Sequence, residues 1–321
     1  MGANSSAIKQ KLQKRFICGA SFEKRDFKSK YTLGSTLGKG TFGKIVEATQ
    51  RRSFKTVAVK FIKKKNVESL SEIDGQMIPS ECVFLNHLDH PNIISLIDLY
   101  EFKSKFAVVL ERPLASMDLS KFVSQFGPQS DNIASYVASQ LLAVCSYMQE
   151  SSIFHRDLKS ENILIDAFTY QINIIDFGSS AWIQKDDDTF LGDYGTPAFS
   201  PPEWINGQAY YPESCTIWNI GVILYELIIG CLPFTSEKDV KKCHLNFPDH
   251  VSNVAKDFIK KLLQHDLCLR PTYSEARNHI FLDMDLPEFG ERLLDSSTYS
   301  KCSAYTHYTN HAADGLPMSL I

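Results

Sequence analysis

The sequence predicts an α+β fold with two lobes: the first is built on an antiparallel β-sheet with one main helix, and the second is mostly helical. Short β-branched or alternating runs dominate between Tyr31 and Leu110, whereas apolar residues recur at helical spacing between Asp118 and Leu282. With 321 residues, the chain is long enough for two lobes and a substantial core.

The composition is that of an ordinary globular protein, with 44% hydrophobic and 22% charged residues. A net charge of −3 argues against a general nucleic-acid binder, so we expect no nucleic-acid partner. The eight cysteines are scattered without a C-x-x-C pair, which is typical of a reduced, intracellular protein. The chain lacks both an apolar run near the ~18 residues of a membrane span and the apolar core of a signal peptide. We expect a monomer that resides in the cytoplasm or the nucleus.

The first lobe, residues 31–110, follows a polar and basic stretch, residues 1–30, which we expect to be a disordered leader. Its helix is expected at "SECVFLNHL", residues 80–88. Its strands are expected at residues 31–38, 43–49, 56–62, 93–100 and 106–111.

A connection at residues 111–117 leads to the second lobe, residues 118–282, and a tail without a clear period follows at 283–321. Helical spacing is clearest in "DNIASYVASQLLAVCSYMQE" (131–150) and "WNIGVILYELIIG" (218–230), whereas "ILID" (163–166) and "INIID" (172–176) are typical of short strands.

The stretch "GKGTFGKI" places Gly38, Gly40 and Gly43 in a G-x-G-x-x-G pattern. Glycines allow backbone N–H groups to approach phosphate oxygens closely. The next residues have strand character, so we interpret the motif as a flap between two strands that covers a ligand. A plain glycine-rich hairpin explains this motif equally well when it is considered alone.

The stretch "VAVK" places Lys60 in an apolar strand. Burying its ammonium group there would cost free energy unless an anion lies beside it. Glu81, at the start of the expected helix, is the candidate partner. The alternative is a lysine that faces solvent.

Three stretches in the second lobe complete the pattern: "HRDLKSENILI" (155–165), "DFG" (176–178) and "GTPAFSPPEW" (195–204). Together with the glycine motif and Lys60, they resemble the protein kinase superfamily in order and spacing, over residues 31–282. The resemblance implies the bilobal protein-kinase fold and a serine/threonine kinase that uses ATP and Mg²⁺.

The resemblance also assigns roles to individual residues. Asp157 would accept the proton of the substrate hydroxyl, Lys159 would neutralise the transferred phosphate, and Lys60 with Glu81 would position the phosphates of ATP. Asn162 and Asp176 would hold Mg²⁺. The residues expected around ATP, besides Lys60, are Leu37, Gly38, Gly40, Gly43, Ile45, Ala58, Leu110, Glu111 and Leu164.

Within the superfamily, "LERP" (110–113), "ENILID" (161–166), "IDFGSSA" (175–181) and "SPPEW" (200–204) resemble the PIM family of the calmodulin-dependent kinase group. The PAS-domain kinases are the alternative relatives, through "VKFIKK" (59–64). Most kinases donate a hydrogen bond to adenine from the residue that is Pro113 here, and proline has no N–H. Only the Glu111 carbonyl is then left to meet adenine.

Another departure is Thr216, at a position where most kinases have an aspartate that anchors the catalytic loop. We expect the threonine hydroxyl to provide a weaker anchor. The resemblance also predicts an ion pair between Glu203 and Arg270.

Three acids, Asp118, Glu161 and Glu226, match positions that face substrate arginines in basophilic kinases. With Thr196, which is expected near Asp157 and Lys159, they form the predicted substrate-binding set. We therefore expect protein substrates with Arg- or Lys-containing segments, although each acid taken alone is as well explained as a solvated surface charge.

The segment "KDDDTFLGDYGTPAF" (185–199) suggests activity without an upstream kinase, since a carboxylate of Asp186, Asp187, Asp188 or Asp193 could take the place of a phosphate beside Arg156. The alternative is an acidic, solvated loop. Thr189 and Ser200 are candidate phosphorylation sites.

The first residues, "MGANSS", fit the pattern for myristoylation of Gly2, and "KQKLQKR" (9–15) is a polybasic stretch that would provide a second membrane signal. This predicts weak membrane association if Gly2 is acylated. The alternatives to an active protein kinase are a pseudokinase that acts as a scaffold or binding module, and a small-molecule kinase.

Overall fold

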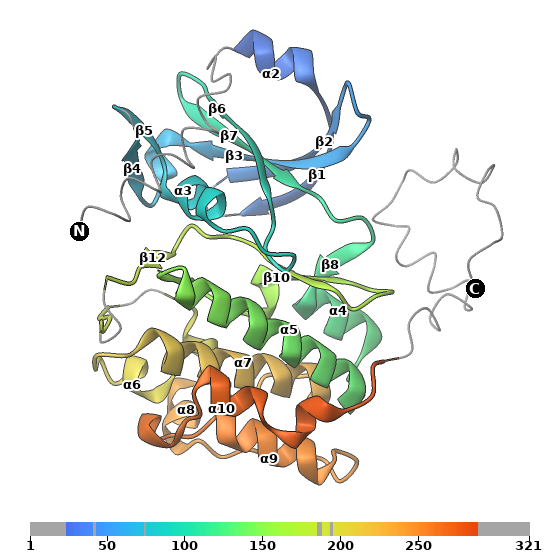
Figure 1. Cartoon of the computed structure of the whole chain (residues 1–321), viewed down its shortest axis with the longest axis vertical. Helices are drawn as coiled ribbons and strands as arrows, with labels where there is room; N and C mark the ends of the chain where they lie inside the picture. Colours follow the sequence, from blue (N-terminus) through green and yellow to red (C-terminus); the bar gives the residue numbers. More distant parts are fainter. Residues whose placement is uncertain (1–23, 41–42, 74, 185–187, 193–194, 288–321) are drawn as a thin grey trace, which may run out of the picture.

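The computed structural model describes residues 24–40, 43–73, 75–184, 188–192 and 195–287. Figure 1 shows a small β-rich lobe above a larger helical lobe, as the sequence predicts. The predicted α+β fold with an antiparallel sheet in the first lobe is therefore confirmed.

The small lobe contains a five-stranded antiparallel sheet with the strand order β1-β2-β3-β7-β6. Its strands are β1 (Tyr31–Gly40), β2 (Gly43–Gln50), β3 (Thr56–Lys63), β6 (Leu96–Glu101) and β7 (Lys105–Glu111). All five were predicted, because their residues form short β-branched or alternating runs.

The alternation separates two faces of this sheet. Val46, Val59 and Val109 lie opposite one another and belong to one face, which is buried. The neighbouring row of Ile45, Lys60 and Val108 belongs to the other face. The register therefore assigns Lys60 to the face opposite the one that carries Val46, Val59 and Val109.

The outer face carries a core that the sequence reading missed. Helix α2 (Lys24–Lys30) covers it, and Phe27 of this helix is 5% exposed, with its ring centroid 5.2 Å from that of Tyr100 and 5.5 Å from that of Tyr31. The prediction of a disordered leader is therefore wrong for residues 24–30. A single buried aromatic in a short basic stretch has no periodicity that could have revealed it.

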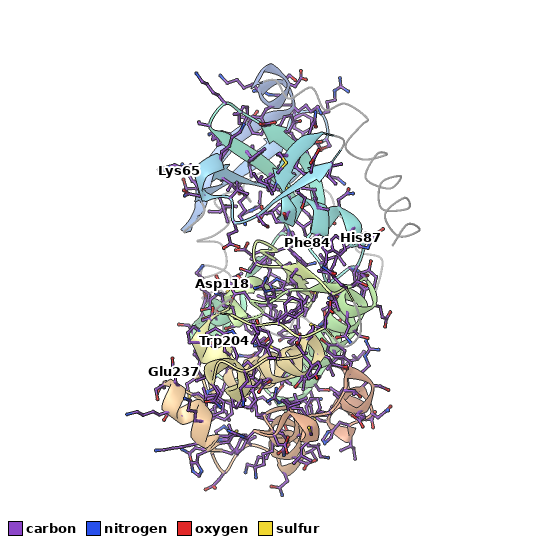
Figure 2. All side chains as sticks on the ribbon, turned by 90° about the vertical axis from the view of Figure 1, so that its left-hand side faces the viewer. Lys65, Phe84, His87, Asp118, Trp204 and Glu237 are labelled. Carbon is purple, nitrogen blue, oxygen red and sulfur yellow. The ribbon has the colours of Figure 1, made fainter. Side chains whose placement is uncertain are left out.

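Helix α3 (Ser80–His87) packs on the opposite side of the sheet, as predicted for residues 80–88. A β-hairpin made of β4 (Leu70–Ile73) and β5 (Gln76–Pro79) precedes it and was not predicted. The far end of α3 meets the large lobe, where Phe84 and His87 (Figure 2) lie with their ring centroids 5.2 and 5.3 Å from that of Trp182.

The large lobe is organised around α5 (Asp131–Glu150) and α7 (Pro212–Ile229), which pack against each other. Its other helices are α4 (Leu119–Phe126), α6 (Pro202–Ile205), α8 (Glu237–Lys242), α9 (Asn253–Leu262) and α10 (Tyr273–Arg277), with 3₁₀ turns at 160–162, 197–199, 267–269 and 280–283. Among the residues that the structure describes, no helix combines the length and apolarity needed to cross a bilayer.

Short strands line the top of this lobe. The predicted β10 (Ile163–Asp166) and β11 (Ile172–Ile174) form a three-stranded sheet with β8 (Ser116–Asp118). A second small sheet joins β9 (Ile153–Phe154) to β12 (Ala181–Trp182). These strands fix the ends of the two loops that carry the polar residues between the lobes.

A buried ion pair ties α6 to the end of the lobe. Arg270 donates from Nη1 and Nη2 to the two carboxylate oxygens of Glu203, both at 2.7 Å, and the Arg270 side chain is fully buried. This bidentate geometry confirms the predicted pair, and the burial makes it a structural rather than a solvent-exposed contact.

The position of α2 leads to a stability prediction. Replacing Phe27 with alanine removes a buried aromatic side chain, so we expect the free energy of unfolding to fall by about 3 kcal/mol. Urea denaturation of the purified chain measures this change. Phe54→Ala is the matched control, because that ring is 81% exposed and its removal should leave stability nearly unchanged. An equal effect of the two substitutions would contradict the packing of α2 described here.

Candidate active site

Lys60 lies between two carboxylates that come from different parts of the fold. Its Nζ is 2.8 Å from Glu81 Oε2 on α3 and 2.8 Å from Asp176 Oδ1, which follows β11. Burial acts to lower the pKa of Lys60, but the two carboxylates outweigh it and raise the pKa above its ordinary value. The ammonium therefore keeps its charge, and the predicted Lys60–Glu81 contact is present.

Asp176 has a positive φ of 62° and points its carboxylate toward the sheet of the small lobe. Burial acts to raise the pKa of Asp176, but Lys60 prevails and holds the pKa below its usual range. Asp176 is thus an anion at neutral pH, with one oxygen bound to Lys60 and a second oxygen for another partner.

The loop between β9 and β10 places Asp157 beside Lys159 and Asn162. Lys159 Nζ is 2.8 Å from Asp157 Oδ2, and Asn162 Nδ2 donates to the backbone oxygen of Asp157 at 2.8 Å and to its Oδ2 at 3.1 Å. Thr196, from the later loop, donates from Oγ1 to Asp157 Oδ1 at 2.8 Å and accepts from Lys159 Nζ at 2.7 Å. The two loops therefore converge on one carboxylate, as the sequence reading expected.

The residues predicted to hold a metal fit Mg²⁺. With Nδ2 committed to Asp157, Asn162 can offer its amide oxygen, and Asp176 can offer its second carboxylate oxygen. Both are hard oxygen donors, which Mg²⁺ uses together with phosphate and water. Within the described residues, no group of three His, Cys, Asp or Glu side chains could hold a metal.

The apolar residues predicted around adenine lie at the boundary of the lobes. Ala58 of β3 pairs with Leu110 of β7, Ile45 of β2 pairs with Lys60, and Leu164 lies in β10 of the large lobe. All four are half-buried, which leaves part of each side chain accessible to a ligand. Leu37 and Gly38 of β1 are half-buried too.

The glycines of the β1–β2 flap differ in how closely the rest of the fold surrounds them. A Cβ on Gly43 would lie 1.8 Å from the carbonyl oxygen of Phe61, so the close approach of β3 excludes any larger residue. A Cβ on Gly38 would have no heavy atom within 4 Å, so the space beside this residue is open to a ligand. Gly40 ends β1, opposite Gly43.

The connection between the lobes, residues 111–117, is called the hinge here and has an unusual hydrogen-bond pattern. Glu111 uses its N–H on Ser95 O at 2.9 Å, and Pro113 has no N–H, although its carbonyl accepts from Ser116 Oγ at 2.9 Å. Arg112 pairs with Glu47 at 3.1 Å. As predicted, the position that donates in most kinases carries no donor.

The three acids predicted to face a substrate lie close enough to interact. Glu226 of α7 is buried and accepts from Ser160 Oγ at 2.6 Å. Burial raises the pKa of Glu226, and the charges of Glu161 and Asp118 raise it further. Asp118 also caps α4, where it accepts from Lys121 N at 2.9 Å and pairs with Lys121 Nζ at 2.6 Å. Only Glu161 is exposed.

Aromatic rings lie next to Arg156. The Phe190 ring lies 5.7 Å from the Arg156 guanidinium carbon and 5.2 Å from the Phe154 ring. Phe190 also exchanges two backbone hydrogen bonds with Tyr210. Asp188 accepts from Gln184 N at 2.5 Å, and Asp186, Asp187 and Asp193 lie outside the described residues.

Two predictions about this region are wrong. Ser200 is 5% exposed and donates to Thr196 O at 3.0 Å, so it is too buried to be a phosphorylation site, whereas Thr189 is exposed. Thr216 does not anchor the catalytic loop as expected. Its hydroxyl donates to Pro212 O at 2.8 Å, and Tyr273 hydrogen-bonds to it.

Sequence reasoning missed three residues at the site. Glu68 lines the same cavity as Lys60 and Glu81 and accepts from Ser179 Oγ at 3.4 Å. Ser160 orients Glu226, and Phe190 covers Arg156. Ser160 and Phe190 stand within quoted stretches but at positions to which no role was assigned, and Glu68 stands in none. Each contact joins residues far apart in the chain, so local spacing contained no signal for it.

Comparisons with known proteins agree with this geometry. The family described as protein kinase domain matches residues 31–282. Serine/threonine-protein kinase pim-2 of Danio rerio is 30% identical over 84% of this chain and 90% of its own length. Serine/threonine-protein kinase prk-2 of Caenorhabditis elegans is 33% identical over 79% of this chain and 58% of its own. NUAK family SNF1-like kinase 1 of Mus musculus is 37% identical over 80% of this chain and 39% of its own.

The convergence on Asp157 can be tested at Thr196. Valine at this position keeps the size but removes both hydrogen bonds, so we expect kcat to fall about tenfold or more because the carboxylate and the Lys159 ammonium lose their shared partner. Steady-state kinetics measures the change. Thr196→Ser keeps the hydroxyl and should stay within about threefold of the parent. Equal kcat values for the valine and serine variants would show that the contact has no catalytic part.

Proposed function

The chain belongs to the protein kinase family, and from this premise we propose that it transfers the γ-phosphate of magnesium-bound ATP to serine or threonine in basic protein segments. That it is a serine/threonine protein kinase follows from its family and its relatives. The observation that carries the phosphoryl-transfer part of the proposal is the pairing of Lys60 in the small lobe with Asp176 in the large lobe. Asn162 lies beside this pair, since its backbone oxygen accepts from Ile175 N at 2.9 Å, and its side chain donates to Asp157.

Phosphoryl transfer requires mainly positioning and the neutralisation of charge. Lys60 offers a cation for the α- and β-phosphates, and Glu81 keeps this cation in place. Mg²⁺, when bound, would neutralise the developing charge on the phosphates, with Asn162 and Asp176 as the residues that hold it. The adenine would lie between Ala58, Ile45 and Leu164, with the Glu111 carbonyl as its acceptor.

At the other end, Asp157 would orient the substrate hydroxyl and accept its proton. Lys159 lies 2.8 Å from the same carboxylate, where a cation can offset the charge of the transferred phosphate. Thr196 joins these two groups and belongs to the loop on which a peptide would lie, so peptide docking and catalysis would share this residue.

The preference for basic segments is supported by Glu226, Glu161 and Asp118. Three acids that interact with one another favour a cationic partner, because their mutual repulsion falls when an arginine or lysine binds among them. The relatives that this chain resembles are named as serine/threonine kinases, and their names contain nothing about sequence preference.

Activity without an upstream kinase is supported by the Phe190 contacts. In protein kinases, a phosphate on the segment that corresponds to residues 185–199 normally orders that segment by pairing with the arginine beside the catalytic aspartate. Here the Phe190 ring already covers Arg156, and two backbone hydrogen bonds join Phe190 to Tyr210. We infer that this aromatic contact helps to order the segment of residues 185–199; three of the carboxylates that the sequence suggested, Asp186, Asp187 and Asp193, lie outside the described residues.

The alternatives are weaker. A pseudokinase scaffold would be favoured by the loss of Lys60, Asp157 or Asp176, and all three are present and in contact with partners. A small-molecule kinase is disfavoured by the segment anchored through Glu203 and Arg270, which offers a platform for a peptide. A monomer in the cytoplasm or nucleus, with membrane association if Gly2 is acylated, also stays a proposal; Gly2 lies outside the described residues.

The proposed transfer is tested with Asp157→Asn. We expect kcat for a basic serine peptide to fall by at least about a hundredfold, because the amide cannot accept the proton, while KM for ATP changes little. A radiometric peptide assay measures both constants. Asp249→Asn, at an exposed position, should behave like the parent. Equal turnover by the parent and the Asp157 variant would refute the assignment.

The role of Glu226 leads to a pH prediction. Because burial raises the pKa of Glu226, its carboxylate is fully ionised only above that raised value and is protonated as the pH falls through it. We expect KM for an arginine peptide to rise on acidification, at a higher pH than an exposed glutamate would titrate, while KM for the alanine analogue stays constant. Glu226→Gln should remove this difference, whereas Glu161→Gln should keep it but move it to lower pH, because the charge of Glu161 helps to raise the pKa of Glu226. Identical pH profiles for the two peptides would exclude a basic preference at this site.

The aromatic contact at Arg156 gives a further prediction. Protein dephosphorylated with a phosphatase should already be active, and Phe190→Ala should lower its kcat at least about fivefold, because Arg156 and the segment lose their common contact. Thr189→Ala is the control and should leave kcat unchanged. A dephosphorylated parent that is inactive until another kinase treats it would contradict the proposal.

A further inference from the structure

We propose that the outer end of the small lobe binds the anionic surface of a lipid bilayer. The surface, which we call the basic crown, consists of Lys28, Arg51, Arg52, Phe54, Lys55 and Lys103, and all six side chains are exposed. They come from α2, the β2–β3 turn and the β6–β7 turn, at the end of the molecule farthest from α9 and α10 (Figure 1).

The β2–β3 turn is held firmly and presents an apolar ring to solvent. Gln50 N donates to Lys55 O at 2.9 Å, and Phe54 N donates to Gln50 O at 2.8 Å. Phe54 has a φ of 57°, which is unfavourable for a bulky residue, and its ring is 81% exposed. The turn therefore holds an aromatic side chain in water, where a partner outside the fold can reach it.

The turn is joined to α2, so the crown is a continuous surface. Arg51 donates from its backbone N to Lys30 O at 2.8 Å and from Nε to Lys28 O at 3.2 Å. These bonds fix the β2–β3 turn against the helix, and both elements present their cations on the same end of the lobe.

The acids near the crown do little to cancel its charge. Asp98 accepts hydrogen bonds from Tyr31 and Tyr100 and lies 3.9 Å from Lys30, and Glu101 pairs with Lys64. Asp26 is the other acid in these elements and is half-buried. The crown therefore carries five cations although the chain as a whole has a net charge of −3.

A groove beside the crown has the character of a membrane-interface surface. It has a volume of about 810 Å³, and Phe27, Phe61 and Phe102 lie along it together with Lys28, Arg51 and Lys103. Lysine and arginine can lay their aliphatic stems over such rings while their charged ends reach lipid phosphates.

A bilayer fits these features better than an acidic protein or a nucleic acid does. Phe54 projects from a convex turn between cations, which suits insertion among acyl chains beneath anionic headgroups. The stretch "KQKLQKR" and the myristoylation pattern at Gly2 precede α2 in the sequence, and a single acyl chain requires a second signal for stable attachment. With the crown on the bilayer, the acids of the large lobe that face a substrate would stay accessible.

The test uses the full chain with an unacylated Gly2, so that no acyl chain contributes to binding and the crown variants differ from the parent only in the crown. Vesicles of phosphatidylcholine, with or without roughly one third phosphatidylserine, are sedimented at about 0.1 M salt. We expect at least about tenfold more protein bound to the anionic vesicles, and binding should fall as salt is raised. Because one cation near such a surface contributes about fivefold in affinity, the double variant Arg51→Glu/Arg52→Glu should lose binding by at least about tenfold. Phe54→Ala should lose it by about tenfold as well.

The matched control is Lys241→Glu/Lys242→Glu on α8, which makes the same change in net charge in the large lobe. This variant should bind anionic vesicles like the parent, and peptide phosphorylation should be unchanged in all variants. Equal losses for the α8 and crown variants would overturn the proposal, as would equal binding to neutral vesicles. Retention on polyglutamate or RNA without vesicle binding would also overturn it and would assign the crown to an acidic protein or a nucleic acid.

Discussion

One buried ammonium group, Lys60 Nζ, holds the two lobes in their working arrangement. Its carboxylate partners come from α3 in the small lobe and from the segment after β11 in the large lobe, each at 2.8 Å. A buried charge without partners would be costly, so the sheet, the helix and the large lobe must all be in place before Lys60 is satisfied. The direction of α3, the loop at Asp176 and the row of Ile45 and Val108 on the sheet all follow from this requirement.

The large lobe uses charge in a different way. Arg270 and Glu203 are fully paired and buried, so they stabilise the platform without taking part in chemistry. Around Arg156, by contrast, the cation lies over the aromatic ring of Phe190. This contact is the basis of the proposal that the segment of residues 185–199 is ordered without a phosphate.

The sequence predicted those parts of the fold and the site that depend on local pattern. The five strands, α3, α5 and α7 stand in apolar or alternating runs, and Lys60, Asp157 and Asp176 stand in motifs whose chemistry limits the alternatives. Helix α2 and the β4–β5 hairpin have no such runs. The partner of the Thr216 hydroxyl depends on which groups the packed structure brings near, and in the structure it donates to Pro212 O within its own helix. Gly43 was taken as a phosphate contact, whereas the carbonyl of Phe61 already requires glycine there.

The hinge at Pro113 has a consequence for inhibitor chemistry. Heterocycles designed for most kinases present an acceptor and a donor to the hinge, and the acceptor expects the N–H that proline lacks. The Glu111 N–H does not replace it, because Ser95 O already holds it. An inhibitor's acceptor atom placed against this hinge would give up its hydrogen bond to water and gain none from the protein in return. Compounds that present only a donor, or that contact the lobe through shape and Lys60, would therefore discriminate this enzyme from kinases with an ordinary hinge.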